Sequence, residues 1–383
     1  MSVTAAGGFR AAGATGGLKP SGTPDVALVV NDGPRHDAAA VFTANRCKAN
    51  PVLWSEQVVH DGRLSAVVLN SGGANCYTGP DGFQTTHASA ELVAGLVGAG
   101  AFDVAVCSTG LIGERLDRPK LEEGIRKAAA ALDIEGGADA ARAIMTTDTR
   151  PKQAAVGGDG WVVGGMAKGA GMLAPALATM LVVLTTDALA DGPMLDRALR
   201  AASSVTFDRL DTDGCMSTND TVLLLASGAS GVAPVEAAMT DAVTRLCDDL
   251  ARQLLADAEG AHHEIAIEVV GAATEADAVA AGRAVARSNL FKCAIFGGDP
   301  NWGRVLAAVG TTGSVFDPAA VDVAMNGVWV CRAGGVGESR DAVDLSGRHV
   351  TVRIDLKAGD AGATILTTDL THDYVHENSA YST

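Results

Sequence analysis

The chain has 383 residues, which is long enough for about two domains with sizeable hydrophobic cores. Hydrophobic residues make up 48% of the sequence and aromatic residues only 4%, so we expect a globular protein whose core is built from small aliphatic side chains. The formal net charge of -16 argues against a nucleic-acid-binding surface and against binding to anionic membranes, because both need a basic face.

The cysteines, the histidines and the N-terminus carry few signals. The seven cysteines are scattered and odd in number, which is typical of reduced thiols in a cytoplasmic protein. No Cys/His cluster has the spacing of zinc ligands, so we expect no metal site. The N-terminus lacks a basic region followed by an apolar one, so no secretory signal is visible, and no apolar run approaches the ~20 residues that span a bilayer. We therefore expect a soluble, cytoplasmic protein that binds neither nucleic acid nor membrane.

Short apolar runs and amphipathic segments alternate along the first half of the chain. Runs rich in Val and Ala predict strands, and helical periodicity predicts helices. Pro119 stands in the first turn of one such helix, where its missing N–H is tolerated. The predicted strands are 26–30, 39–43, 65–69 and 104–107, and the predicted helices are 86–98 and 118–132.

The alternation continues through the second half, which predicts an α/β fold. A shift in composition near 271–275 divides a main α/β domain, residues 1–270, from a smaller C-terminal α/β domain, residues 271–383, with a docked tail. The predicted strands of this half are 161–164, 180–185, 264–270, 349–356 and 363–367, and the predicted helices are 195–203 and 235–258.

The segment 168–181 places Ala178 directly before Thr179, and an apolar run follows at once. If the Ala178–Thr179 bond is cut, Thr179 becomes a new N-terminus whose free amine lies beside its hydroxyl. Such an amine has a pKa near ~8 and can act as the base for that hydroxyl. A buried strand with Thr179 at its entrance explains the same residues without any chemistry, so the junction alone leaves both interpretations open.

Three further positions suit a reaction of this kind. Thr109 and Gly110 follow a predicted strand in a glycine-flanked turn, which can aim a hydroxyl and a backbone N–H at one point to form an oxyanion hole. Glu259 ends a long helix, where the helix dipole disfavours a carboxylate unless a cation, such as a substrate ammonium, is bound. Lys168 lies in a glycine-rich loop and suits a substrate carboxylate. An ordinary turn and solvated surface side chains are the alternatives.

Together these motifs resemble those of the ornithine acetyltransferases of arginine biosynthesis, also called glutamate N-acetyltransferases. The shared stretches keep the family order from one end of the chain to the other, and 168–181 is the most specific of them. They are residues 7–13, 69–75, 107–113, 143–148, 168–187, 217–221, 257–260, 299–304 and 377–383.

The resemblance implies a layered α/β helix–sheet sandwich of the N-terminal-nucleophile-like acetyltransferase type. It also implies a precursor that cleaves itself between Ala178 and Thr179. The α chain would be residues 1–178 and the β chain would begin at 179. Thr179 would take acetyl from N²-acetylornithine as an ester and pass it to glutamate by a ping-pong route, giving ornithine and N-acetylglutamate. Thr109 and Gly110 would form the oxyanion hole. The implied substrate-binding residues are Thr146, Lys168, Thr179, Glu259, Asn378 and Thr383.

The resemblance also implies that no metal or organic cofactor is needed and that the enzyme assembles as an (αβ)₂ heterotetramer. It leaves open whether acetyl-CoA serves as a second acetyl donor and whether the pathway is arginine or secondary-metabolite synthesis. One departure concerns Ala261-His262-His263, which stands where many members carry a small residue and then Thr-Lys. This departure leaves the acceptor preference open.

Other functions remain open on the residues alone. An N-terminal-nucleophile amidase or aminopeptidase would use the same Thr179 but pass the acyl group to water. Residues 169–174 match the dinucleotide-binding pattern G-x-G-x-x-A, but Pro175 and an apolar run follow instead of a long helix. A nucleotide-binding protein would keep an uncut chain, and a non-catalytic interaction protein would leave the Ala-Thr junction unexplained.

Overall fold

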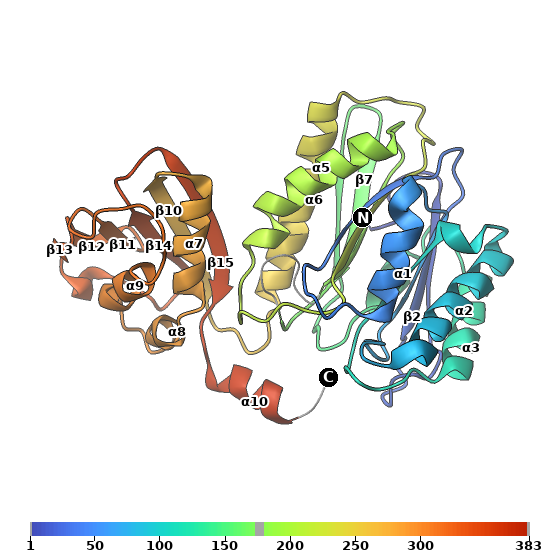
Figure 1. Ribbon diagram of the computed structural model, residues 1–383, viewed down its shortest axis with the longest axis horizontal. Helices are drawn as coiled ribbons and strands as arrows, with labels where there is room; N and C mark the ends of the chain where they lie inside the picture. The colour runs from blue at the N-terminus through green and yellow to red at the C-terminus, as the bar shows by residue number, and fades with distance from the viewer. Residues whose placement is uncertain (1, 173–179, 381–383) are drawn as a thin grey trace. The chain divides into compact units, whose positions relative to one another are not determined.

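A computed structural model describes residues 2–172 and 180–380 (Figure 1). These residues form two compact units: unit 1 contains the described part of 1–208 together with 215–257, and unit 2 contains 209–214 and 258–380. The sequence analysis places the boundary near 271 instead. The strand β10 (Glu264–Ala272) lies in unit 2 because it pairs with β14 and β15. The final segment of unit 2 begins at Ala258, thirteen residues before 271, so the shift in composition near 271 does not mark the boundary.

Unit 1 contains two sheets. One has the strand order β1-β2-β4-β5 and the other the order β3-β9-β8-β7-β6. The neighbours β4 and β5 are parallel, as are β8 and β9, and the other pairs are antiparallel. The strands are β1 (Phe9–Ala14), β2 (Val26–Asn31), β3 (Asp37–Phe42), β4 (Ala66–Asn70), β5 (Val104–Ser108), β6 (Lys152–Gly157), β7 (Val162–Lys168), β8 (Leu181–Thr186) and β9 (Thr221–Ala226).

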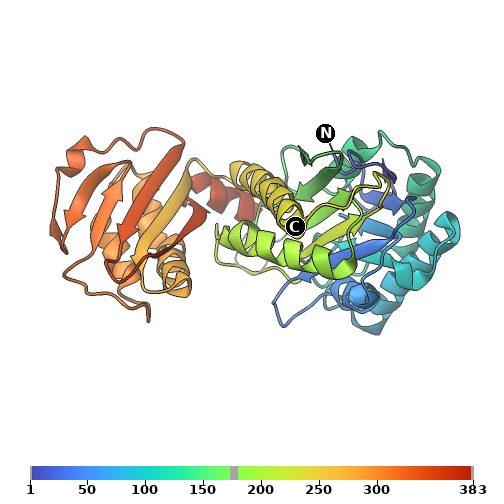
Figure 2. The same ribbon diagram turned by 90° about the horizontal axis from the view of Figure 1, so that it is seen from above.

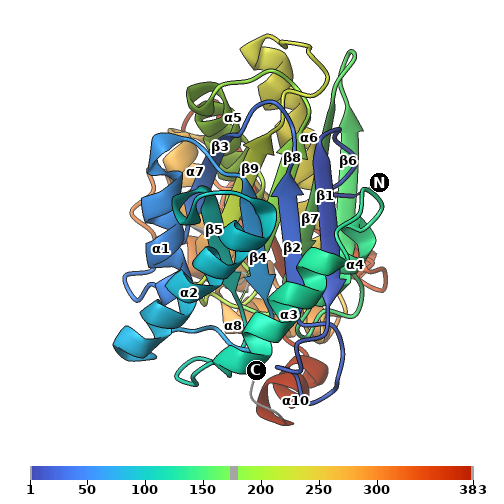
Figure 3. The same ribbon diagram turned by 90° about the vertical axis from the view of Figure 1, so that its right-hand side faces the viewer.

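Helices cover the outer faces of the two sheets of unit 1 (Figure 3). α1 to α4 pack on the four-stranded sheet, and α5 and α6 pack on the five-stranded sheet. This order of layers confirms the α/β helix–sheet sandwich predicted from the sequence. The helices are α1 (Asn50–Val58), α2 (Gly79–Val97), α3 (Arg118–Ala130), α4 (Gly137–Ala143), α5 (Gly192–Val205) and α6 (Glu236–Ala256).

The core of unit 1 lies between its layers and draws on both sheets. Val67 and Val106 of one sheet belong to the same buried cluster as Val183 and Leu223 of the other. Burial of one such side chain stabilises the fold by roughly 1.5–3 kcal/mol. Because β8 is covered on both faces, all six of its residues are buried. This burial explains why its sequence is a continuous apolar run rather than an alternating one.

Unit 2 is a six-stranded sheet of order β13-β12-β11-β14-β10-β15, and α7 packs against β10 and β15 (Figure 2). Buried and partly exposed residues alternate along β10, as expected for a sheet covered mainly on one face. The further elements are α7 (Glu275–Ala286), α8 (Asn289–Phe296), α9 (Trp302–Val309), β11 (Asp322–Met325), β12 (Val328–Arg332), β13 (Gly335–Val336), β14 (His349–Asp355), β15 (Ala361–Thr368) and α10 (His372–Ala380).

The predicted elements mostly lie where the sequence places them, with a few differences. α2 begins at Gly79, seven residues before the predicted start at 86, because Pro80 occupies its first turn. Lys168 ends β7 and is not part of a loop. None of the seven cysteines, all of which the structure describes, forms a disulfide. None of the helices in the described part of the chain combines the length and the apolar character needed to span a membrane.

Candidate active site

The predicted site residues are divided between the two units. Thr109, Gly110, Thr146 and Lys168 lie in unit 1, whereas Glu259 and Asn378 lie in unit 2. Ala178, Thr179 and Thr383 lie outside the described residues. The neighbour of Thr179, Met180, is described and begins the approach to β8.

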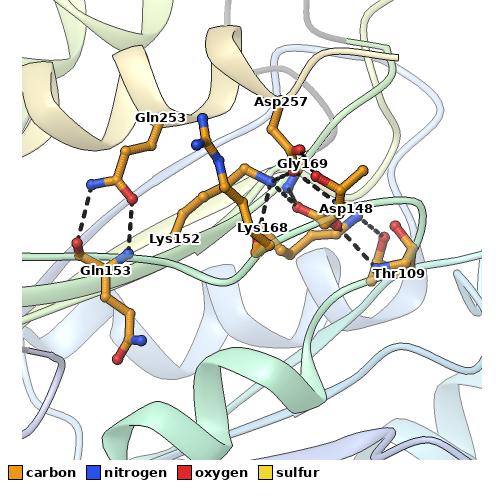
Figure 4. A network of polar contacts seen from close by, with 11 residues as sticks. Thr109, Asp148, Lys152, Gln153, Lys168, Gly169, Gln253 and Asp257 are labelled. Atoms are coloured by element: carbon orange, nitrogen blue, oxygen red, sulfur yellow. Dashed lines mark hydrogen bonds and ion pairs between the residues drawn. The ribbon is translucent and has the colours of Figure 1, made fainter. Parts of the chain in front are cut away.

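The ends of β5 and β7 bring two of the predicted residues into contact. Thr109 directly follows β5, and Lys168 is the last residue of β7. The Lys168 Nζ donates a hydrogen bond of 3.1 Å to the Thr109 Oγ1 (Figure 4). Both residues are buried, and only 1% of the accessible surface of Lys168 is exposed. Lys168 is therefore not a solvated surface lysine, and its charge lies beside the predicted oxyanion hole.

Gly110 has a backbone that only glycine adopts without strain. Its φ is +128°, and a Cβ at this position would lie 2.9 Å from both the N and the Cα of Gly73. The chain is held there by backbone hydrogen bonds, since the Gly73 N–H donates to the Thr109 carbonyl over 3.0 Å. The turn after β5 is thus packed tightly against the turn after β4, which fixes the position of Thr109 and Gly110.

Asp148 joins the loop that contains Thr146 to the end of β7. Its side chain is fully buried. One carboxylate oxygen accepts the Thr146 N–H over 3.0 Å, and the other accepts the Gly169 N–H over 2.7 Å. The sequence analysis did not assign Asp148 a role, although it lies in the shared stretch 143–148. Its contacts place it at the centre of the predicted site in unit 1.

Lys152 is a second residue that the sequence did not reveal. Its side chain has no exposed surface, and its Nζ forms ion pairs with both Asp148 and Asp257 (Figure 4). Asp257 in turn accepts the Thr149 N–H over 3.0 Å. A buried charge is tolerated only when it is paired and hydrogen-bonded, and Lys152 meets this condition by bridging two carboxylates.

The charges of this buried network determine the ionisation of Asp148. Burial alone would raise the pKa of its carboxyl, but the nearby ammonium groups of Lys168 and Lys152 outweigh burial, so the pKa is lowered. The network contains two lysines, Lys152 and Lys168, and two aspartates, Asp148 and Asp257. We infer that Asp148 is a carboxylate at neutral pH and holds the backbone at Thr146 and Gly169 in place.

The start of β9 comes next to the end of β5 and the start of β8. The Asn219 Nδ2 donates to the Ser108 carbonyl over 2.8 Å. The Met180 N–H donates to the Asp220 Oδ1 over 3.0 Å. Since Leu181 pairs with Lys168 on one side and with Thr221 on the other, the residues around Lys168, Met180 and Asp220 gather at one end of the five-stranded sheet.

In unit 2 the structure brings Glu259 and Asn378 together. Glu259 stands in the turn after α6, and the Asn378 Nδ2 donates to its Oε2 over 3.0 Å. The tail helix α10 packs on this turn, because a Cβ at Gly260 would lie 2.1 Å from the Tyr374 nitrogen. Burial, together with the negative charges of Glu259 and Asp373, raises the pKa of Glu377. This concentration of acidic groups favours a bound cation.

The unusual pair His262 and His263 is also engaged within unit 2. The His262 Nε2 lies 2.7 Å from an oxygen of Asp373, and the His263 Nδ1 lies 2.7 Å from an oxygen of Asp369. These contacts brace the turn beside Glu259. In the described part of the chain, no group of three or more His, Cys, Asp or Glu side chains is placed to hold a metal ion.

Comparisons with known proteins cover the whole chain. The profile of the ArgJ family matches residues 10–383. The arginine biosynthesis bifunctional protein ArgJ of Streptomyces coelicolor is 65% identical over 382 residues, with 100% of both chains covered. Its namesake from Thermobifida fusca is 63% identical over 383 residues, again with 100% of both chains covered.

Two solved structures are also similar in sequence. The ornithine acetyltransferase complexed with ornithine from Mycobacterium tuberculosis is 55% identical and covers 47% of this chain and 96% of its own, with a TM-score of 0.45. The arginine biosynthesis bifunctional protein of Bacillus halodurans is 34% identical and covers 51% of this chain and 97% of its own, with a TM-score of 0.49.

Proposed function

The chain belongs to the ArgJ family, and we propose that it moves acetyl from N²-acetylornithine to glutamate through an ester on Thr179. It is an acetyltransferase of arginine biosynthesis. The observation that carries the proposed site is the contact between Lys168 and Thr109, which places a buried ammonium group against the hydroxyl of the oxyanion hole. This arrangement suits a reaction in which negative charge develops on a carbonyl oxygen.

The proposed reaction begins with cleavage of the bond between Ala178 and Thr179, which frees the α-amine of Thr179. This amine takes the proton of the Thr179 hydroxyl while the oxygen attacks the acetyl carbon of N²-acetylornithine. The acetyl C–N bond breaks, and ornithine leaves with that proton. The amine of glutamate then attacks the ester, the C–O bond breaks, Thr179 recovers its proton, and N-acetylglutamate is released.

Thr109 and Gly110 form the oxyanion hole in this proposal. The Thr109 hydroxyl and the Gly110 N–H stabilise the negative oxygen of each tetrahedral intermediate. Because the Lys168 ammonium donates to the Thr109 Oγ1, it leaves the hydroxyl hydrogen of Thr109 directed elsewhere, toward the oxyanion. Loss of one such donor typically lowers kcat by about 10²–10³-fold.

The substrate is held by groups of opposite charge. Glu259, with Asn378 beside it, binds the side-chain ammonium of ornithine, and the acidic surroundings of Glu377 support this role. Lys168 attracts the substrate carboxylate, and Thr146 and Thr383 contribute further contacts. Acetyl-CoA as a second donor, the absence of a cofactor, an (αβ)₂ heterotetramer and a cytoplasmic location belong to the same proposal.

The experiment that tests this proposal combines intact mass with product analysis. The purified wild-type chain should give two fragments, residues 1–178 and 179–383, and should convert labelled glutamate into N-acetylglutamate when supplied with N²-acetylornithine. Thr179→Ala should abolish both cleavage and transfer, whereas Thr179→Ser keeps a hydroxyl and should retain part of each.

The matched control is Thr185→Ala, which removes a buried hydroxyl from the same strand, β8, and should leave cleavage intact. Release of free acetate without any N-acetylglutamate would replace the transferase with an amidase that uses the same nucleophile. A cleaved and active Thr179→Ala variant would disprove the mechanism.

A further inference from the structure

Lys19 is a half-buried lysine of unit 1 to which the proposed reaction gives no role. It lies in the loop between β1 and β2. Its Nζ donates hydrogen bonds to the Pro24 carbonyl over 3.0 Å and to the Met145 carbonyl over 2.6 Å. An ammonium group has three N–H donors. Among the residues that the structure describes, both hydrogen-bond partners of Lys19 are neutral carbonyl oxygens, so neither of them neutralises its charge.

The backbone of this loop is held by one buried carboxylate. Asp25 has no exposed surface, and its oxygens accept the backbone N–H groups of four consecutive residues, 16–19, over distances of 2.6–3.2 Å. Hydrogen bonds to an ionised acceptor are stronger than those between neutral groups. The side chain of Lys19 therefore extends from a fixed backbone.

The packing of Leu18 places the loop beside the turns of the predicted oxyanion hole. Leu18 fills the space beside Gly72, because a Cβ at Gly72 would lie 2.2 Å from the Leu18 Cβ. The next residue, Gly73, is the one that packs against Gly110. The loop 16–19, the turn after β4 and the turn after β5 therefore pack against one another in that order.

The carbonyl group that precedes Thr146 connects Lys19 to the other predicted residues of unit 1. This carbonyl accepts the 2.6 Å hydrogen bond and belongs to the same peptide group as the Thr146 N–H. That N–H donates to Asp148, whose other oxygen accepts the N–H of Gly169, the residue after Lys168. A short chain of contacts thus joins the ammonium group of Lys19 to the segment that contains Lys168.

The ammonium groups of Lys19 and Lys168 are close enough to act on each other. Burial lowers the pKa of Lys19, and the positive charge of Lys168 adds to this effect, whereas the charges of Asp25 and Asp148 oppose it in part. Both aspartates already accept backbone N–H groups. A ligand carboxylate beside the two ammonium groups would offset both their burial and their mutual repulsion.

We propose that Lys19 binds the α-carboxylate that N²-acetylornithine and glutamate have in common. This inference rests on the proposed function, to whose carboxylate site it adds a second cation. Lys168 already donates to the Thr109 Oγ1, so it cannot direct all of its N–H groups at a substrate. With Lys19 on the α-carboxylate, the site selects α-amino acids over simple amines.

N-acetylputrescine separates carboxylate binding from a structural role, because it is N²-acetylornithine with the α-carboxylate replaced by hydrogen. Lys19→Met keeps an unbranched side chain but removes the charge. With N²-acetylornithine as donor, its kcat/KM should fall by about 10–100-fold, as for loss of a hydrogen bond to a charged group. With N-acetylputrescine, kcat/KM should stay within about threefold of the wild-type value. The KM for glutamate should rise as well. Formation of N-acetylglutamate is the measured rate.

Two results would overturn the inference. One is an equal loss of kcat/KM with both donors, which would mean that Lys19 supports the loop without binding a carboxylate. The other is a Lys19→Met enzyme within about threefold of wild type with N²-acetylornithine. If N-acetylputrescine is not turned over, its inhibition constant against N²-acetylornithine gives the same comparison. If Lys19→Met lacks the wild-type thermal transition, Lys19→Gln takes its place with the same expectations.

Lys127→Met is the matched control. Lys127 lies on α3 in unit 1, and its Nζ donates to the carbonyl of Thr15, near the same loop, over 3.3 Å. This variant also removes one positive charge, so it measures any general effect of charge on substrate attraction. Its kcat/KM should equal that of wild type with both donors, and a loss like that of Lys19→Met would overturn the inference. A cleaved wild-type chain that forms no N-acetylglutamate would instead contradict the proposed function itself.

Discussion

Asp148 and Asp220 are two buried aspartates of unit 1 whose surroundings shift their pKa values in opposite directions. Asp148 faces two ammonium groups and accepts backbone N–H groups at both oxygens, so its charged form is favoured despite burial. Burial raises the pKa of Asp220 well above its usual range, and hydrogen bonds from Met180 and Ser217 and the charge of Lys168 offset this only in part. The same residue type is therefore favoured as a charged carboxylate in one place and as a neutral carboxyl group in the other.

The lowered pKa of Asp148 predicts how the stability of the protein depends on pH. A carboxyl whose pKa is lower in the folded than in the unfolded state contributes stability above its unfolded pKa of about 3.9. That contribution is lost as the pH falls through the folded value. Asp148→Asn should therefore be less stable than wild type at pH 7, and the difference should shrink as the pH falls below about 4.

Denaturant unfolding of both proteins from pH 7 down to acidic pH measures this difference. Both variants for this comparison carry Thr179→Ala, so that unfolding is that of a single uncut chain. A gap in the free energy of unfolding that stays constant over the whole range would mean that Asp148 acts by packing rather than by charge. Asp322→Asn is the control. The pKa of Asp322, which lies in unit 2, is also lowered, so this variant measures the same pH dependence of stability away from the proposed site.

Some of these residues were predictable and others were not. Thr109 and Gly110 were singled out because a strand followed by a glycine-flanked turn is a local signal, and the structure places both residues directly after β5. Lys168 was also singled out, but its burial at the end of β7 was not expected, since the sequence suggested a glycine-rich loop. Lys152 and Asp220 carry no local signal, because their contacts are with Asp257 and Met180, which lie far away along the chain.

At the scale of elements, the turn after β5 depends on one glycine. Gly110→Ala forces a Cβ to within 2.9 Å of the Gly73 backbone and strains a backbone with φ +128°. Strain of this kind costs about 1–3 kcal/mol. We expect the turn to shift, so that Thr109 and residue 110 no longer face one point, and kcat to fall by at least ~10²-fold, as for loss of one oxyanion-hole donor.

Gly113→Ala is the control for this prediction. Gly113 also has a positive φ, +88°, but nothing lies within 4 Å of a Cβ at that position. The Gly113→Ala variant therefore has the backbone strain without the steric clash. Steady-state kinetics and thermal unfolding of both variants, both fully cleaved, separate the two effects. Equal loss of kcat in the two variants would show that the close approach of Gly73 does not position the oxyanion hole.

Local sequence patterns predicted some strands and helices and missed others. The strand β8 was predicted because burial on both faces makes its sequence a continuous apolar run. The strand β1 was missed because its sequence, FRAAGA, lacks β-branched residues and depends on pairing with β2. Several elements of unit 2, such as the Ala-rich α7, gave no distinct signal between helix and buried strand. Their identity is decided by packing on the sheet rather than by propensity.

At the scale of the whole molecule, the proposed cleavage site falls along the chain between β7 and β8, which are neighbours in one sheet. The fragment 1–178 supplies β3, β6 and β7, and the fragment from 179 supplies β8 and β9. In the order β3-β9-β8-β7-β6, the two strands of the second fragment lie between strands of the first. Hydrogen-bonded registers of six residue pairs on each side, β3 with β9 and β7 with β8, join the fragments.

This interleaving predicts that the cleaved fragments separate only when unit 1 unfolds. Native mass spectrometry should show both fragments in one particle even on strong dilution. The strand pairs β3–β9 and β7–β8 join the fragments, and both fragments contribute to one core. The unfolding temperature of the cleaved protein should rise with protein concentration, since folding then joins two chains. The uncut Thr179→Ala chain is the control. Because this variant folds as a single chain, its unfolding temperature should depend less on protein concentration than that of the cleaved protein. Fragments that separate on dilution while their secondary structure persists would contradict the interleaved sheet as the basis of their association.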